Sequence, residues 1–184
     1  MSKLIMWNLI TLDGMFEGPQ PWDLGFHEYA WGDELEQFSL EQASEVEGLI
    51  FGRRTYEGMA AHWSAAKGET ADFMNAVPKY VFSRTLDRAD WNNSTLVKDD
   101  AAGAVSRLKE APGKDLFVFG SADLSETLSR HGLFDEYRIG VVPVTLGAGV
   151  PLFKTAADQL TLRLVQTRPL GDRCLLLRYQ PAAG

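Results

Sequence analysis

The stretch Gly48-Leu-Ile-Phe-Gly-Arg-Arg-Thr-Tyr-Glu57 decides the fold class. Its short apolar run, Leu49–Phe51, predicts a buried strand that stops at Gly52, and a helical segment follows. A strand that turns through glycine into a helix leaves backbone N–H groups unpaired at the helix start, and such a terminus attracts phosphate. Arg53 and Arg54 add two permanent cations. The stretch therefore indicates a phosphate-binding turn, although an ordinary turn followed by solvated arginines would have the same sequence pattern.

Two further stretches repeat this pattern. In Lys79-Tyr-Val-Phe-Ser-Arg-Thr85, a short strand ends in two hydroxyls and an arginine, which can hold a phosphate through charge-assisted hydrogen bonds. In Asp115-Leu-Phe-Val-Phe-Gly-Ser-Ala-Asp-Leu124, a strand buried on both faces ends at Gly120, which lets the backbone turn and approach a ligand. Ser121 is then expected to be a helix N-cap. Each stretch alone can be an ordinary turn, but three strand ends of this kind favour a ligand site, because open α/β sheets bind ligands there.

Composition limits the class of protein. The 184 residues suit one domain, residues 1–184, with a substantial core. A net charge of −7 argues against nucleic acid or an anionic membrane as the main partner. The sequence contains neither a recognisable secretory signal nor an apolar stretch of membrane-spanning length, so a cytoplasmic protein is expected.

Cysteine and histidine usage gives no sign of a metal site. The single cysteine, Cys174, lies in the apolar run 174–177, which predicts a buried, inert thiol rather than a nucleophile. The three histidines, His27, His62 and His131, lack metal-ligand spacing. We therefore expect no metal.

Hydrophobic patterning predicts a regular alternation of strands and helices. Strands are expected at Lys3–Ile10, Leu49–Phe51, Tyr80–Phe82, Thr95–Lys98, Leu116–Phe119, Glu136–Val144, Leu160–Thr167 and Arg173–Gln180. Helices are expected at Asp33–Glu47, from Tyr56 onward, at Ala71–Ala76, from Ala101 to Pro112, and at Ala122–Arg130. Thr11–Phe26 is read as a long connection. This order predicts a three-layer α/β/α sandwich with a mainly parallel central sheet and an antiparallel hairpin at its C-terminal edge.

The order of these motifs along the chain resembles that of a known family. The segments Gly52-Arg-Arg-Thr-Tyr-Glu57, Val81-Phe-Ser-Arg-Thr-Leu86, Val118-Phe-Gly-Ser121 and Pro143-Val-Thr-Leu-Gly-Ala-Gly-Val-Pro-Leu-Phe153 occur in the order typical of the dihydrofolate reductase-like superfamily. Thr11-Leu-Asp-Gly14 makes the chain most similar to the branch that contains the C-terminal reductase domain of bifunctional riboflavin-biosynthesis proteins. The resemblance covers nearly the whole chain.

The resemblance implies an NADPH-binding fold. By motif, Gly52, Arg53, Arg54 and Thr55 would meet the cofactor phosphates, Ser83 and Arg84 would lie near the 2′-phosphate, and Lys98 would flank the adenine. The pyrophosphate would lie on Gly120, Ser121, Ala122, Asp123 and Leu124. These are the same three turns that the residues alone indicate as phosphate sites.

Two departures narrow the expected activity. The deaminase half of the bifunctional riboflavin proteins, with its His/Cys zinc signature, is absent, so a stand-alone reductase is implied. Dihydrofolate reductases also carry one carboxylate on the helix after the first loop. The expected helix here holds several acids, from Asp33 to Glu47, and no spacing singles one out. No catalytic group is identified, Asp13 and Asp33 are the candidates, and activity with dihydrofolate is not expected.

The substrate pocket is expected along the loop after the first strand and the helix that follows. The candidates are Asp13, Trp22, Asp23, Phe26, Trp31 and Phe38, with Trp63 as a further wall. Aromatic side chains can stack on a flat heterocycle. The tryptophans can equally pin down a long loop, Trp63 can belong to the core, and Asp13 can be a turn residue before Gly14.

These inferences lead to a reductase that uses NADPH and transfers a hydride to a small heterocycle of pteridine or aminopyrimidine type. The alternative is a nucleotide-binding regulatory or interaction module that has lost catalysis. The apolar strands after Phe134, and the dimers that related riboflavin reductase domains form, imply a homodimer.

Overall fold

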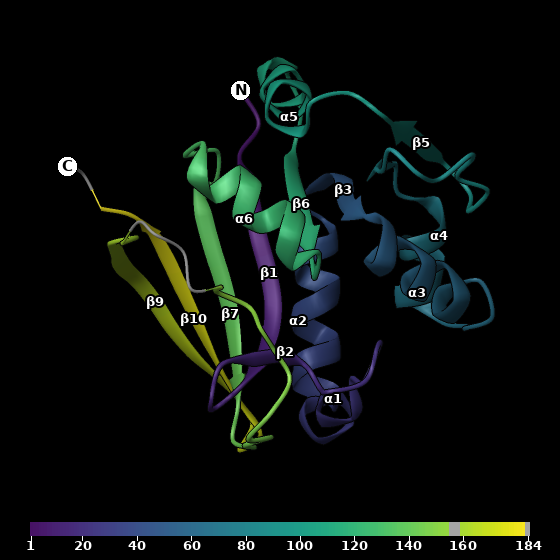
Figure 1. The fold of residues 1–184 in the computed structure, drawn as a ribbon. Helices are drawn as coiled ribbons and strands as arrows, with labels where there is room; N and C mark the ends of the chain where they lie inside the picture. The colour runs from purple at the N-terminus through teal and green to yellow at the C-terminus, as the bar shows by residue number, and fades with distance from the viewer. Residues whose placement is uncertain (155–158, 183–184) are drawn as a thin grey trace.

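The computed structural model describes residues 1–154 and 159–182, and these residues build one twisted sheet between two helical layers (Figure 1). The sheet has eight strands. In spatial order they are β5 (Ser94–Val97), β4 (Lys79–Phe82), β3 (Val46–Gly52), β6 (Asp115–Phe119), β1 (Leu4–Thr11), β7 (Glu136–Val142), β10 (Cys174–Pro181) and β9 (Leu162–Leu170). The strands from β5 to β7 run parallel, and β10 is antiparallel to both β7 and β9. The predicted parallel sheet with an antiparallel C-terminal edge is confirmed.

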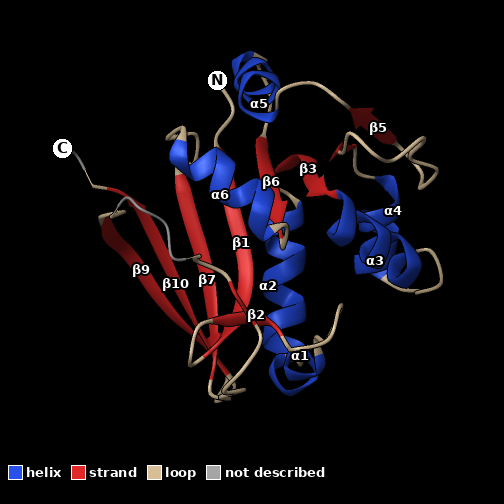
Figure 2. Cartoon of the chain, viewed as in Figure 1, coloured by secondary structure: helices blue, strands red, loops and turns tan. Residues whose placement is uncertain are grey.

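Helices cover both faces of this sheet (Figure 2). One layer consists of α5 (Ala101–Glu110) and α6 (Ala122–Arg130); the other consists of α1 (Gly25–Ala30), α2 (Asp33–Ala43), α3 (Arg53–Trp63) and α4 (Glu69–Ala76). The alternation along β3 shows why. Ile50 packs in the cluster that includes Val105 of α5, whereas Leu49 and Phe51 pack with Tyr56 of α3. Because successive strand residues point to opposite faces, an uninterrupted apolar run requires cover on both sides.

Several element boundaries differ from the prediction. The helix expected over Asp33–Glu47 ends at Ala43, because Val46 is buried and starts β3 while Glu47 faces solvent, as strand alternation requires. The helix α3 begins at Arg53, directly after Gly52, and not at Tyr56 as predicted, so both arginines lie in its first turn.

Three short elements were not predicted. The helix α1 begins at Gly25, within the predicted connection Thr11–Phe26, and extends past it to Ala30. A small second sheet pairs β2 (Met15–Glu17) with β8 (Val150–Pro151). Gly149 permits this pairing, because a Cβ there would lie 2.4 Å from Glu17 O. Among the described residues, no helix is long and apolar enough to cross a membrane.

The parallel arrangement brings the predicted ligand-binding turns to one edge. Gly52 at the end of β3 is the register partner of Phe82 in β4, which in turn pairs with Val97 in β5. The end of β6 adjoins β3 on the other side. The carboxyl ends of four neighbouring strands, β5, β4, β3 and β6, therefore line up.

Candidate functional site

Two of the predicted turns are joined by hydrogen bonds into one surface at the ends of β3 and β6. Gly52 N donates to Ser121 Oγ over 2.9 Å, and Ser121 N donates to Thr55 Oγ1 over 2.9 Å. Gly52 is the N-cap residue of α3, and within the described part of the chain no side chain caps this helix. The N–H groups of its first turn, from Arg53 to Thr55, are therefore left for an external acceptor.

The close approach at Gly120 comes from Thr55. Gly120 has φ +54°, and a Cβ added there would lie 2.9 Å from Thr55 Oγ1. The missing side chain at Gly120, predicted to let a ligand approach the backbone, thus also lets the Thr55 side chain approach it. Gly120 N donates to Asn8 Oδ1 over 2.7 Å. Ser121 is the N-cap residue of α6, as predicted, but its hydroxyl donates to Phe119 O over 3.0 Å and makes no capping hydrogen bond to the helix.

The other residues predicted to bind the cofactor phosphates lie along the same edge of the sheet. Because the ends of β3, β4 and β5 are in register, Arg53, Ser83 and Lys98 leave the sheet from neighbouring strands. Arg53 Nη1 donates to Thr85 Oγ1 over 2.9 Å, which ties the first turn to the second. Arg84 and Lys98 are exposed. The edge therefore presents cations and hydroxyls side by side.

The first turn of α6 completes this edge. It is formed by Ala122, Asp123 and Leu124, and the carboxylate of Asp123 pairs with Lys154. The Asp123 side chain is 82% exposed. The cation therefore offsets the one acidic side chain in the first turn of this helix.

A cavity of about 360 Å³ opens beside the joined turns, on the sheet face covered by α2, α3 and α4. Thr55 and Gly120 form part of its wall, so it continues directly from the edge described above. Most of its lining is apolar and aromatic, with Trp7, Phe16 and Phe73 among the contributors. A cavity of this size and character suits a small flat ligand.

Three predicted aromatic side chains line the cavity: Trp22, Trp31 and Trp63. Trp22 lies at φ 62°, and its ring rests on α3, because a Cβ added to Gly58 would lie 2.4 Å from it. Trp22 and Trp31 are both partly exposed, at 38% and 42%.

Glu17 holds the Trp22 loop against α3. Glu17 Oε1 accepts hydrogen bonds from Trp22 N over 2.9 Å and from Arg54 Nη2 over 3.2 Å. The Glu17 side chain is 10% exposed, whereas that of Arg54 is 69% exposed. The guanidinium therefore remains accessible to an anion at the mouth of the cavity.

The remaining predicted substrate residues lie outside the cavity lining. Phe26 and Phe38 are each 6% exposed and belong to the core under α1 and α2. The Asp13 carboxylate accepts hydrogen bonds from Thr11 Oγ1 over 2.5 Å and from Gly147 N over 2.7 Å. The Thr11 hydroxyl, followed by the Gly147 amide, lowers the pKa of Asp13. Asp13 thus anchors the connection between β7 and β8.

No carboxylate of α2 lines the cavity within the described residues. Asp33 is exposed in the first helical turn, and Asp23 of the preceding loop is also outside the lining. The residues that α2 contributes are Leu35, Ser39, Gln42 and Ala43.

Several polar groups of the lining were missed by the sequence analysis. Asn8 Nδ2, His27 Nε2 and Thr70 Oγ1 are buried, and each lacks a hydrogen-bond partner among the described residues. Buried polar atoms are nearly always paired, so unpaired groups around one cavity point to a bound molecule that completes them. The signal for Asn8 was present in the sequence, as an amide inside an otherwise apolar strand.

Burial also sets the protonation of two side chains. It lowers the pKa of His27 to about 4, so the imidazole in the cavity wall is neutral at pH 7. Burial raises the pKa of the Cys174 thiol to about 11, which disfavours the nucleophilic thiolate, and the predicted burial of this residue is confirmed.

Comparisons with known proteins agree with this architecture. The family model described as the RibD C-terminal domain matches residues 2–176. The uncharacterized protein YyaP of Bacillus subtilis is 29% identical over 187 residues, which span 96% of this chain and 94% of YyaP.

Solved structures share the fold. A Shewanella sp. PV-4 protein whose name places it in riboflavin biosynthesis has a TM-score of 0.82 and 19% identity, with both chains covered completely. A Thermotoga maritima enzyme, named as a deaminase and 5-amino-6-(5-phosphoribosylamino)uracil reductase, has a TM-score of 0.70 and 14% identity over 98% of this chain and 57% of its own. The dihydrofolate reductase of Enterococcus faecalis, solved with NADP(H), has a TM-score of 0.65 and 13% identity over 99% of this chain and 97% of its own.

Proposed function

This chain belongs to the RibD C-terminal domain family, and we propose that it is a reductase that uses NADPH to reduce a small, flat heterocyclic substrate. The observation that carries the proposal is the junction between the strand-end turns and the cavity. Thr55 takes part in both, because its hydroxyl accepts from Ser121 N and its side chain lines the cavity. A dinucleotide laid along the edge would end at the place where a flat ring can stack.

The residues present fit such a cofactor. The first turns of α3 and α6 offer backbone N–H groups to phosphates, and Arg53, Arg54 and Arg84 add cations. Ser83 and Arg84 follow β4, where a basic, hydroxyl-bearing pair suits the 2′-phosphate that distinguishes NADPH from NADH. The unpaired Asn8 Nδ2 lies where the edge meets the cavity, since Asn8 Oδ1 is bonded to Gly120 N. When bound, NADPH would supply the hydride.

The protein's own contribution is to orient the substrate and exclude water. The Trp22 loop, held by Glu17, closes one side of the cavity, and Trp31 and Trp63 provide flat apolar surface. A dry, apolar site strengthens the few polar contacts that it contains. The described lining offers no free carboxylic acid next to the aromatic walls, so the neutral imidazole of His27 is the ionisable group best placed to hydrogen-bond the substrate.

Cofactor oxidation tests this proposal against the alternative of a binding module without catalysis. NADPH absorbance would be followed with a panel of dioxo- and amino-substituted pyrimidines and pteridines, and NADPH binding would be measured separately. Oxidation that depends on both protein and substrate supports the reductase. Tight NADPH binding without oxidation of any panel member would support the binding module instead.

A further inference from the structure

A buried ion-pair network fixes one amide of the cavity wall. Arg138 on β7 is 4% exposed, and its Nη1 donates to Gln42 Oε1 over 3.0 Å. Its Nε and Nη2 donate to Glu136 and Glu45, each over 2.7 Å. Arg178 on β10 also donates to Glu136, over 2.9 Å. With three hydrogen bonds in place, the guanidinium cannot turn away from Gln42 without leaving a buried charge unpaired.

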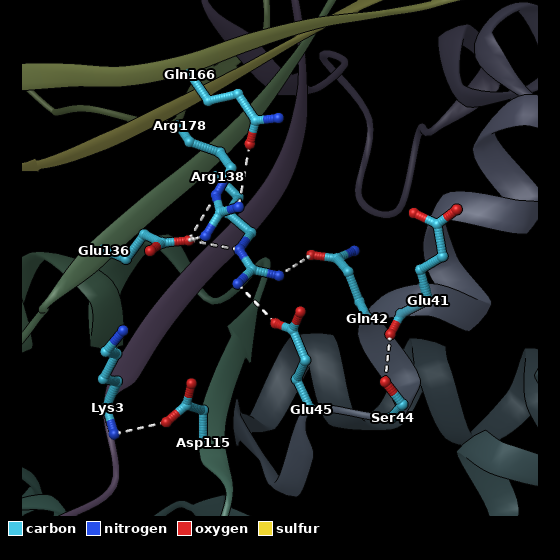
Figure 3. A network of polar contacts seen from close by, with 10 residues as sticks. All are labelled: Lys3, Glu41, Gln42, Ser44, Glu45, Asp115, Glu136, Arg138, Gln166 and Arg178. Atoms are coloured by element: carbon cyan, nitrogen blue, oxygen red, sulfur yellow. Dashed lines mark hydrogen bonds and ion pairs between the residues drawn. The ribbon is translucent and has the colours of Figure 1, made fainter.

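This network decides which end of the Gln42 amide faces the cavity. Gln42 lines the cavity and is 5% exposed. Figure 3 shows its oxygen directed at Arg138 and its amide nitrogen on the opposite side. No hydrogen bond from Nε2 is found among the described residues. The α2 wall therefore presents an N–H donor from this residue, and not an acceptor.

The charge of the cavity wall adds a second constraint. Its ionisable lining consists of Glu17, Glu57 and Arg54 together with His27. Glu57 pairs with Arg53, Arg54 pairs with Glu17, and burial keeps His27 neutral above about pH 4. Arg54 is thus the only full cation in the described lining, and it stands beside a carboxylate. Arg54 is 69% exposed at the mouth, where it is shared between Glu17 and the proposed cofactor phosphates. A substrate phosphate inside the cavity would therefore find no positive charge of its own.

The following inference rests on the reductase function proposed above. We propose that Gln42 selects the substrate by donating its Nε2–H to a ring carbonyl. The substrate is then an uncharged, oxo-substituted flat ring without a phosphate. A ring that carried an amino group at this position would place N–H against N–H and leave two buried donors unpaired. The absence of phosphate separates this substrate from the phosphoribosylamino-uracil named for the Thermotoga maritima enzyme.

The test uses pairs of ligands that differ only in the feature at issue. The protein saturated with NADP⁺ is titrated by calorimetry with 2,4-dioxopteridine and 2,4-diaminopteridine, and then with uridine and uridine 5′-monophosphate. Saturation keeps the monophosphate off the cofactor's phosphate sites. We expect the dioxo ring to bind at least about tenfold more tightly than the diamino ring, since even one of the two unpaired buried donors would produce a difference of this size. Uridine 5′-monophosphate should bind no more tightly than uridine.

Substitutions at Gln42 identify the group responsible. Gln42→Glu keeps an acceptor for Arg138 Nη1 and replaces the donor with a second acceptor, so the preference should shift about tenfold or more toward the diamino ring. Gln42→Met removes the donor without adding charge and should abolish the preference, which keeps the test decisive if the glutamate variant does not fold. Gln166→Glu is the matched control, because Gln166 accepts from Arg178 over 3.1 Å in the same network and lies outside the cavity lining.

Repeating the ring titrations without cofactor separates this inference from the proposed function. If NADPH fails to bind, the reductase proposal fails, but the affinities for the two pteridines still test whether Gln42 selects between them. Equal affinity for the two pteridines, a preference that survives Gln42→Met, or tighter binding of the monophosphate than of uridine would each overturn the inference.

Discussion

Thr55 Oγ1 accepts a hydrogen bond from Ser121 N over 2.9 Å, and this contact joins two helix starts that are 66 residues apart in the chain. Ser121 is buried, so the bond closes the gap between α3 and α6 at the sheet edge. It makes one surface from two turns that the sequence presents separately. The proposed cofactor site depends on that union.

Removing the Thr55 hydroxyl should therefore weaken both the fold and the site. Thr55→Val keeps the shape but leaves the buried Ser121 N unpaired, which costs about 1–3 kcal/mol. We expect a lower free energy of unfolding in urea and weaker NADPH binding. Thr95→Val, at an exposed position of β5, is the control and should change neither quantity. An unchanged Thr55→Val protein would show that the contact contributes nothing.

Gly120 and Gly132 separate steric contact from backbone strain. Both have positive φ, +54° and +63°, but a Cβ at Gly120 would press on Thr55 whereas nothing lies within 4 Å at Gly132. Each change to alanine should cost about 1 kcal/mol of unfolding free energy through strain. Gly120→Ala should additionally reduce NADPH affinity, as measured by calorimetry. If the two variants bind NADPH equally, the Gly120 turn is not part of the site.

The buried imidazole of His27 predicts a loss of stability in acid. Its pKa is about 4 in the folded protein, against 6.5 for an exposed histidine, so between these values the unfolded chain takes up the proton first. Stability is therefore present above pH 6.5 and lost as the pH falls toward 4, by up to about 3 kcal/mol. Urea unfolding across this range should show a steeper loss for the wild type than for His27→Asn. His62→Asn, at an exposed position, should follow the wild type; parallel curves for all three would refute the prediction.

The edge hairpin carries the prediction of a homodimer. Leu164 and Leu175 are 51% and 41% exposed, and strand pairing places them on one face of the hairpin. Apolar side chains on an exposed edge favour association. Light scattering should give about twice the chain mass of 20.4 kDa. Leu164→Glu with Leu175→Glu should yield the monomer, while Leu12→Glu, at another exposed leucine, should not. A wild-type mass near 20.4 kDa would reject the dimer.

The strand ends could be predicted because their signals are local. An apolar run that stops at Gly52 or Gly120 identifies a buried strand and its turn without knowledge of the rest of the chain. The end of α2 was misplaced because Glu45 and Glu47 fit a helical charge pattern, and only the packing of Val46 in the sheet decides against it. The strands β2 and β8 are too short to leave a pattern, and they exist because the chain folds back on itself.

The polar part of the cavity could not be predicted from sequence. Gln42 is one of several polar residues on an amphipathic helix, and its role depends on Arg138, which lies on a strand far along the chain. Phe26 and Phe38 illustrate the converse. Their aromatic side chains suggested a surface for stacking on the substrate, but both pack in the core under α1 and α2. Trp22 and Trp31 line the cavity instead.

The proposed function depends on the binding of NADPH to the joined strand-end turns. Calorimetric titration of the protein with NADPH and NADH at low salt tests it most directly, with Arg84→Ser to remove the proposed 2′-phosphate contact and Arg107→Ser, an exposed arginine on α5, as the control. We expect NADPH to bind at least about tenfold more tightly than NADH, since a charge-assisted contact contributes about 1.5–3 kcal/mol, and we expect only Arg84→Ser to reduce the difference. Equal affinity for the two cofactors, or no binding of either, would contradict it.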